Sequence, residues 1–158
     1  MSIKNRLTED AKQALKAGDK TRVACLRMLR AKILEREVAL RPKKGTTYEL
    51  DDDEALQVLT SYAKQRQESI DSYHQGGRED LVAREQAELE IVRHYLPEPL
   101  SDERIRHIVA ESVAELGATS PREMGAVIKR VMARTRGAAD GRLVSRLVRE
   151  ALEDGGTP

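Results

Sequence analysis

The 158-residue sequence has few aromatic residues, a single cysteine and no long apolar run. Tryptophan and phenylalanine are absent, and with only four tyrosines we do not expect unpaired bases to stack on an aromatic platform. The lone cysteine, Cys25, excludes an internal disulfide and a thiolate metal site. No stretch approaches the ~18 consecutive apolar residues of a membrane span, and the start, MSIKNRLTED, lacks the apolar run of a secretion signal. These absences favour a cytoplasmic protein that does not bind a membrane.

Motifs that carry catalysis or hold a cofactor are also missing. The sequence contains no phosphate loop, no G-x-G-x-x-G after a strand, no H-E-x-x-H and no G-x-S-x-G. The three histidines, His74, His94 and His107, show no metal-ligand spacing to one another or to Cys25. Cys25 lies among apolar residues of a predicted helix and is interpreted as a small core residue, not a nucleophile. We therefore expect no catalytic residue, no metal site and no cofactor.

What the sequence does contain is apolar spacing of three and four along nearly its whole length, which predicts an all-α fold. A first helix is expected from about Ile3 to Ala17. The second is expected to follow the Asp19 cap and end near Leu40, with a loop from Arg41 onward because RPKKGTTYELD combines Pro, Gly and charge. The buried stripe of this second helix is expected to be Val23, Leu26, Leu29, Ile33 and Leu34.

Two further helical stretches, separated by Gly76 and Gly77, are expected to form a long antiparallel hairpin. Arg66 interrupts the apolar seam of the first of them. The hairpin register places Arg66 opposite Glu85 and Glu88, so we predict an ion pair with one of these glutamates inside the hairpin. The pair is interpreted as structural, fixing the register of the two helices; the alternative is a functional polar site in a helical groove.

Prolines at 97 and 99 predict a break in the helical pattern. We expect an N-terminal helical domain at 1–96, a linker at 97–100, and a small C-terminal three-helix bundle at 101–158. Ser101 and Asp140 are expected to cap its first and last helices, and SPRE at 120–123 is a capping box with Pro at the first helical position. The middle helix should stop near Gly137.

Basic charge is concentrated in blocks despite a net charge of only +1. Residues 122–149 contain eight Lys and Arg against two acids, of which we expect only Asp140 to lie near the basic side chains. Arginines spaced by three and four share a helix face and suit bidentate contact with phosphate, so this segment predicts a phosphate-binding surface. The alternative is a solvated helix face. The expected RNA-binding residues are Lys129, Arg130, Arg134, Arg136, Arg142, Arg146 and Arg149.

Several motifs occur in a characteristic order along the chain. They are KQRQES at 64–69, GREDLVAREQAELEIVRHYLP at 77–97, YLPEPLS at 95–101 and GAADGRLVSRLVREAL at 137–152. Together they resemble the GatB/YqeY family of stand-alone proteins, and LRMLRAKILERE at 26–37 fits that family's second helix. The resemblance extends from about Leu7 to Leu152.

The resemblance implies an all-helical protein with a larger N-terminal domain and a small C-terminal three-helix domain. It also implies kinship with the tail of the B subunit of the glutamine-dependent amidotransferase that converts mischarged Glu-tRNA(Gln) or Asp-tRNA(Asn). In that enzyme the tail helps to hold the tRNA body, while the catalytic sites lie in other parts. The implied function is a non-catalytic accessory protein that binds tRNA or another structured RNA. Carbon-nitrogen ligase activity with glutamine as amido-N-donor is the enzymatic alternative.

A third hypothesis is a helical protein-protein adaptor, with a protein partner in tRNA metabolism. It rests on charge asymmetry: residues 1–44 hold thirteen Lys and Arg against five acids, and residues 45–96 hold twelve acids against five Lys and Arg. These opposite charges are expected either to complement one another within the fold or to form a docking surface.

Overall fold

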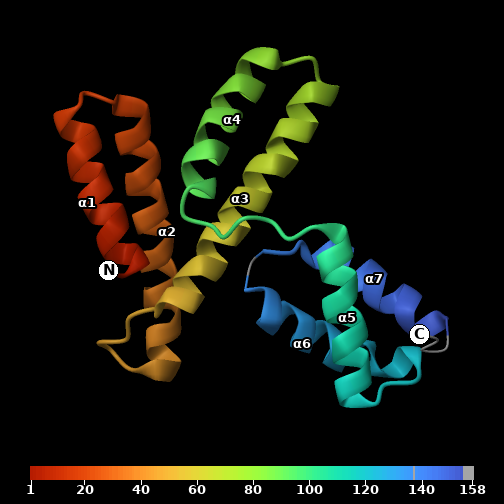
Figure 1. Ribbon diagram of the computed structural model, residues 1–158. Helices are drawn as coiled ribbons and strands as arrows, with labels where there is room; N and C mark the ends of the chain where they lie inside the picture. The colour runs from red at the N-terminus through yellow and green to blue at the C-terminus, as the bar shows by residue number, and fades with distance from the viewer. Residues whose placement is uncertain (137, 155–158) are drawn as a thin grey trace. The chain divides into compact units, whose positions relative to one another are not determined.

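The computed structural model describes residues 1–136 and 138–154, and this part of the chain is helical without any strand. The all-α prediction is therefore confirmed. The expected helix stop at Gly137 and the last four residues of the expected C-terminal domain lie outside the described residues. The elements, labelled in Figure 1, are α1 (Ile3–Lys16), α2 (Lys20–Lys44), α3 (Asp52–Gln75), α4 (Glu79–Arg93), α5 (Asp102–Leu116), the 3₁₀ turn η1 (Pro121–Glu123), α6 (Met124–Thr135) and α7 (Gly141–Glu153).

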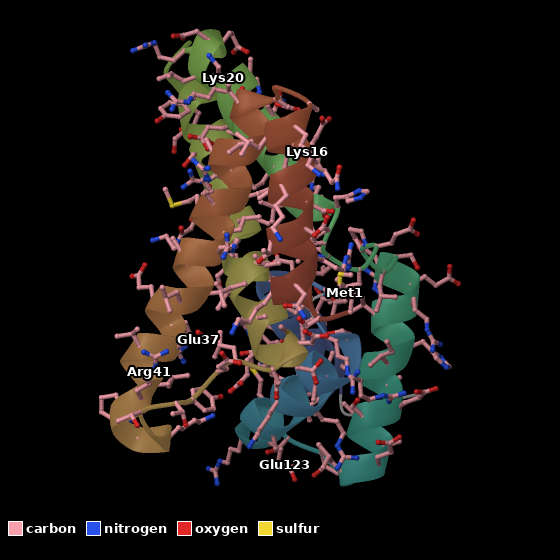
Figure 2. The ribbon with its side chains drawn as sticks, turned by 90° about the vertical axis from the view of Figure 1, so that its left-hand side faces the viewer. Met1, Lys16, Lys20, Glu37, Arg41 and Glu123 are labelled. Atoms are coloured by element: carbon pink, nitrogen blue, oxygen red, sulfur yellow. The ribbon has the colours of Figure 1, made fainter. Side chains whose placement is uncertain are left out.

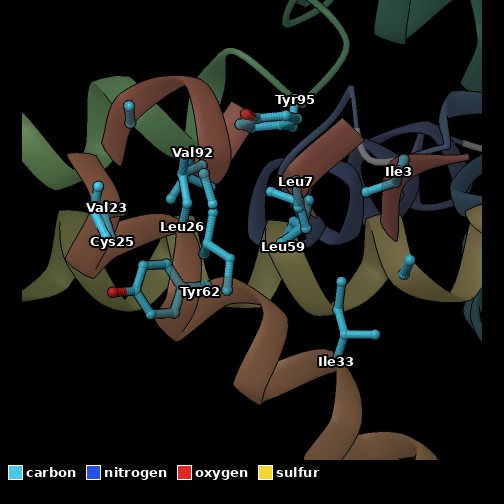
Figure 3. Close-up of a cluster of buried hydrophobic side chains, with 14 of the residues drawn as sticks. Ile3, Leu7, Val23, Cys25, Leu26, Ile33, Leu59, Tyr62, Val92 and Tyr95 are labelled. Atoms are coloured by element: carbon cyan, nitrogen blue, oxygen red, sulfur yellow. The ribbon is translucent and has the colours of Figure 1, made fainter. Parts of the chain in front are cut away.

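The chain divides into two compact units, Met1–Leu96 and Pro97–Pro158. In the first unit, α1 lies beside α2 and α4 lies beside part of the longer α3 (Figure 1). Leu7, Leu26, Leu59 and Val92 come from the four different helices, and each is fully buried in one aliphatic core (Figure 3). Burial of aliphatic side chains on one stripe of each helix is thus the main force that assembles this unit.

Helix α2 is longer than the sequence predicted. Its expected end near Leu40 was wrong, because the helix continues through Pro42 to Lys44. Pro42 has no amide hydrogen to donate to the carbonyl four residues back, but the helical hydrogen bonds resume after it, where the amide of Gly45 donates to the Arg41 carbonyl at 2.9 Å. Leu34 was also misassigned to the buried stripe: its side chain is 52% exposed. Adjacent residues lie about 100° apart around a helix, so Ile33 alone faces the core.

In the second unit, α5, α6 and α7 pack around an aliphatic core that includes Ile105, Val127, Val131, Val144 and Val148. The helix starts are set by local hydrogen bonds. Ser101 accepts from the amide of Arg104 at 3.2 Å, and the predicted capping box between Ser120 and Glu123 is present at η1. These caps satisfy backbone amides that would otherwise have no partner in the first turn.

Candidate nucleic-acid interface

Three arginines form a row on the outer face of α7. Arg142, Arg146 and Arg149 are all exposed, and they lie on the side of the helix opposite buried Val144 and Val148. The carboxylate of Asp140 caps the helix by accepting from the amide of Arg142 at 3.2 Å. The start of α7 therefore already has an anionic group at its positive end, and the exposed cationic groups on this face of the helix are the arginine side chains.

The arginines of this row differ in their contacts. Arg146 lies 3.9 Å from the carboxylate of Glu150 one turn later, and both side chains are more than half exposed. Exposed pairs of this kind contribute little free energy, so a phosphate can compete for Arg146. Arg149 has no ion-pair partner within residues 1–136 and 138–154. Its guanidinium is available to an anionic ligand.

The basic side chains of α6 have partners that the sequence did not reveal. Arg134 Nη2 lies 2.6 Å from Glu111 Oε2, and Arg130 Nη1 lies 2.8 Å from Glu115 Oε2. Both glutamates belong to α5, so the expectation that Asp140 is the only acid near the basic segment was wrong. Packing of α5 against α6 brings in acids from outside residues 122–149. The hydrogen bond from Arg134 outweighs partial desolvation and lowers the pKa of Glu111.

The remaining two predicted side chains are Lys129 and Arg136. Lys129 is exposed and lies about 100° around α6 from Arg130, on a different side of the helix. Arg136 ends α6 in a left-handed backbone conformation, φ 43°, with its amide donating to the Met132 carbonyl at 3.1 Å. The seven predicted side chains therefore do not form one uniform surface: the row on α7 is open to solvent, whereas Arg130 and Arg134 face the acids of α5.

Within the first unit, Arg66 lies between two glutamates of α4. Its Nη1 atom is 3.4 Å from Glu85 Oε2 and 3.5 Å from Glu88 Oε2, and its guanidinium carbon lies 4.8 Å from the centre of the Tyr62 ring. The Arg66 side chain is 24% exposed and that of Glu85 is 14% exposed. The arginine thus connects α3 to α4 in a partly desolvated setting, where electrostatic attraction is stronger than at the surface.

A buried carboxylate that the sequence analysis missed is Glu37 of α2, labelled in Figure 2 one turn before Arg41. The Glu37 side chain is 4% exposed; its Oε1 atom lies 2.6 Å from Lys4 Nζ and accepts from the amide of Leu50 at 3.0 Å. Burial alone would raise the pKa of Glu37, but these two hydrogen bonds outweigh it and hold the pKa below its ordinary value. The carboxylate therefore ties α1, α2 and the loop before α3 together.

In the described part of the chain, no cluster of three or more His, Cys, Asp and Glu side chains is arranged to hold a metal ion. None of the helices in that same part combines the length and the apolar character needed to cross a bilayer.

Comparison with known proteins adds a family match. Residues 4–152 match the family described as "Yqey-like protein". A relative named "Altered inheritance of mitochondria protein 41, mitochondrial", from Eremothecium gossypii, is 34% identical over 90 residues, which are 57% of this chain and 46% of the relative.

Proteins of the same name from other fungi match to a similar degree. The one from Saccharomyces cerevisiae (strain YJM789) is 33% identical over 98 residues, 61% of this chain and 50% of the relative. The one from Pyrenophora tritici-repentis is 28% identical over 151 residues, 93% of this chain and 79% of the relative. The chain thus spans about half the length of the first two relatives.

Proposed function

Because this chain belongs to the YqeY-like protein family, we propose that it binds tRNA or another structured RNA as a non-catalytic accessory protein. The observation that carries the proposal is the exposed arginine row Arg142, Arg146 and Arg149 on α7. Guanidinium groups match phosphate oxygens in geometry and charge, and a row along one helix face can follow a sugar-phosphate backbone. Contacts of this kind recognise the shape of folded RNA more than its sequence.

The resemblance to the tail of the amidotransferase B subunit supports tRNA as the RNA. In that enzyme the tail helps to hold the tRNA body, and we propose that this chain holds tRNA in the same way without the catalytic parts. We propose the cytoplasm as its location; the names of the fungal relatives assign those proteins to mitochondria. Cell fractionation with an antibody against the chain would decide the location.

The affinity of the purified protein for total tRNA across a salt series tests the proposal. Each phosphate that a cation neutralises releases counterions, so binding should weaken steeply as salt rises. Changing Arg142, Arg146 and Arg149 together to Ala should weaken binding and lower the salt slope by about 2 to 3. A matched control changes Arg27, Arg30 and Arg36 of α2 to Ala, which removes the same charge from exposed positions in the first unit.

Equal losses of affinity in the two triple variants would mean that tRNA binding depends on the overall charge of the protein and that the α7 row is not the binding surface. Absence of any tRNA binding at low salt would refute the proposal. Glutamine-dependent amide transfer to mischarged tRNA by the pure chain would establish the enzymatic alternative. The expected result in that assay is no transfer, because the resemblance is to the tail and not to the catalytic parts.

A further inference from the structure

One face of α2 presents apolar side chains to solvent. Met28, Leu34 and Val38 are 47%, 52% and 50% exposed, and they are half of the large apolar side chains that are exposed among the described residues. The smaller Ala24 and Ala31 on the same face are exposed as well. Because successive residues turn by about 100°, these five side chains occupy about one third of the helix circumference, opposite the buried stripe. This face, the outer stripe of α2, has the character of a contact surface.

The outer stripe also carries one charge of each sign. Arg27 and Glu35 are exposed and lie four residues before and four residues after Ala31. Arg27 has no ion-pair partner in the part of the chain that the structure describes. Glu35 contacts Lys32 at 3.3 Å, in a pair whose side chains are 71% and 44% exposed. Exposed pairs of this kind contribute little free energy, so both charges are available to a partner.

The apolar residues of the outer stripe are spaced symmetrically about Ala31. When a second α2 runs antiparallel and crosses the first at Ala31, residues equally far before and after Ala31 lie level, because both helices rise by about 1.5 Å per residue. Met28 is then level with the partner's Leu34, and Ala24 is level with the partner's Val38. The small side chain of Ala31 lets the two helices approach closely where they cross. The stripe therefore complements itself.

The charges of the outer stripe follow the same symmetry. Arg27 is level with the partner's Glu35, and the two-fold relation forms this ion pair twice. A parallel arrangement in register would instead set Arg27 against the partner's Arg27. The neighbouring cations Arg30 and Lys32 lie about 100° to either side of Ala31, so they point away from the contact.

The remaining cations of α2 do not oppose this arrangement strongly. Those nearest the ends of the helix, such as Arg22 and Arg41, lie about 13 Å or more from Ala31 along the axis. Helices that cross at an angle separate with distance from the crossing point. Lys44 is also bound by Glu54 at 3.0 Å. Salt screens the repulsion that is left between exposed charges.

We propose that the outer stripe of α2 binds a second copy of this chain, in an antiparallel two-fold contact centred on Ala31. Both copies use the same surface, so the contact closes on itself and forms a dimer instead of a filament. One helix face is a small interface, and the dimer is therefore weak. At the low protein concentration of the tRNA titration the chain is monomeric, and the contact does not depend on the RNA surface proposed on α7.

Sedimentation of the full-length chain over a concentration series tests the proposal. The expected result is a reversible equilibrium between monomer and dimer without larger species. Leu34→Glu should weaken the dimer about tenfold or more, because it places a charge level with the partner's Met28. Leu15→Glu is the matched control: Leu15 is a 61% exposed leucine of α1, and this variant should dimerise as the wild type does.

An exchange of charges tests the antiparallel register. Arg27→Glu should weaken the dimer about tenfold, because it sets two glutamates level with each other at both ends of the contact. Arg27→Glu combined with Glu35→Arg should restore the affinity to within about threefold of wild type, since the ion pairs form again with their signs reversed. Arg30→Glu is the control beside the contact, and it should not weaken the dimer.

A cysteine at the crossing point provides a second test of the register. The two copies of residue 31 meet at the two-fold axis, so Ala31→Cys should form a disulfide between chains on oxidation. Ala39→Cys is the control, because its two copies would lie about 24 Å apart along the helices. The native Cys25 is buried and should not react.

A chain that stays monomeric at about 1 mM would overturn the proposal. A dimer that Leu34→Glu leaves intact would place the contact elsewhere on the molecule. Failure of the reversed charge pair to restore the dimer, or disulfide formation by Ala39→Cys as fast as by Ala31→Cys, would refute the antiparallel register. The affinity of Leu34→Glu for tRNA should equal that of wild type, which separates this contact from the proposed RNA surface.

Discussion

Arg134 Nη2 lies 2.6 Å from Glu111 Oε2, so the guanidinium that the sequence assigns to RNA is bound to an acid of the neighbouring helix. Arg134 also lies 3.8 Å from Glu115, which in turn contacts Arg130. The acids of α5 therefore compete with any phosphate for these two arginines.

The double change Glu111→Gln and Glu115→Gln should raise affinity for tRNA about threefold, because it releases Arg130 and Arg134 and removes two negative charges. A tRNA titration at two salt concentrations measures this. The control removes two exposed acids of the first unit, Glu9→Gln with Glu90→Gln. An unchanged affinity in the α5 double variant would mean that the α6 arginines do not reach RNA.

Glu37→Gln should lower stability by about 1 to 3 kcal/mol at neutral pH, because a buried carboxylate bonded to Lys4 loses its charge. The folded-state pKa of Glu37 is lowered from 4.5, so its stabilising contribution is complete above about pH 4.5 and is lost as the pH falls through the lowered pKa. Urea unfolding at pH 7 and at acid pH measures both effects. The difference in free energy of unfolding between wild type and variant should shrink at acid pH. A difference that does not depend on pH would contradict the ion pair between Glu37 and Lys4.

Arg66→Leu should destabilise the first unit by about 1 to 3 kcal/mol, because Glu85 and Glu88 would be left near each other in a partly buried site. Chemical denaturation in a double-mutant cycle with Glu85→Gln isolates the pair. We expect a favourable coupling of about 1 kcal/mol. Additive effects of the two changes would show that the contact at 3.4 Å contributes nothing to stability.

Ser120→Ala should destabilise the second unit by about 1 kcal/mol, because the capping box before α6 loses its side-chain acceptor. Thermal unfolding followed by helical circular dichroism measures the loss. Thr119→Ala is a control at the neighbouring position. Thr119 donates to Glu123 through its backbone amide, and the change to alanine retains that amide. Equal melting temperatures for wild type and Ser120→Ala would exclude a stabilising role for this cap.

Cys25 should resist thiol reagents in the folded protein. Its side chain is buried, and burial raises its pKa to about 11, so little thiolate exists at neutral pH. Labelling with a chromogenic disulfide reagent should be slow in buffer and complete in denaturant. Rapid stoichiometric labelling without denaturant would show that the α2 core opens readily.

Local sequence signals predicted the helix starts well. Asp19, Ser101 and the box from Ser120 to Glu123 all make the capping contacts that their residue types indicate, since a cap needs only neighbours within three residues. The end of α2 was less predictable, because proline usually interrupts a helix and yet α2 continues past Pro42 to Lys44. The exposure of Leu34 was also not predictable, because an apolar residue next to the buried stripe of a helix can lie on either side of the edge between core and solvent.

The sequence by itself determined the all-α fold and the arginine row of α7, since both follow from residue spacing within single helices. Only the tertiary structure decided which charges are engaged. Arg134 contacts Glu111, which is 23 positions away in the sequence, and Glu37 contacts Lys4, which is 33 positions away. Both contacts form because separate helices pack together. Ion pairing depends on distance in space, so no count of charges along the chain could show that α6 is partly neutralised while Arg149 stays open to a ligand.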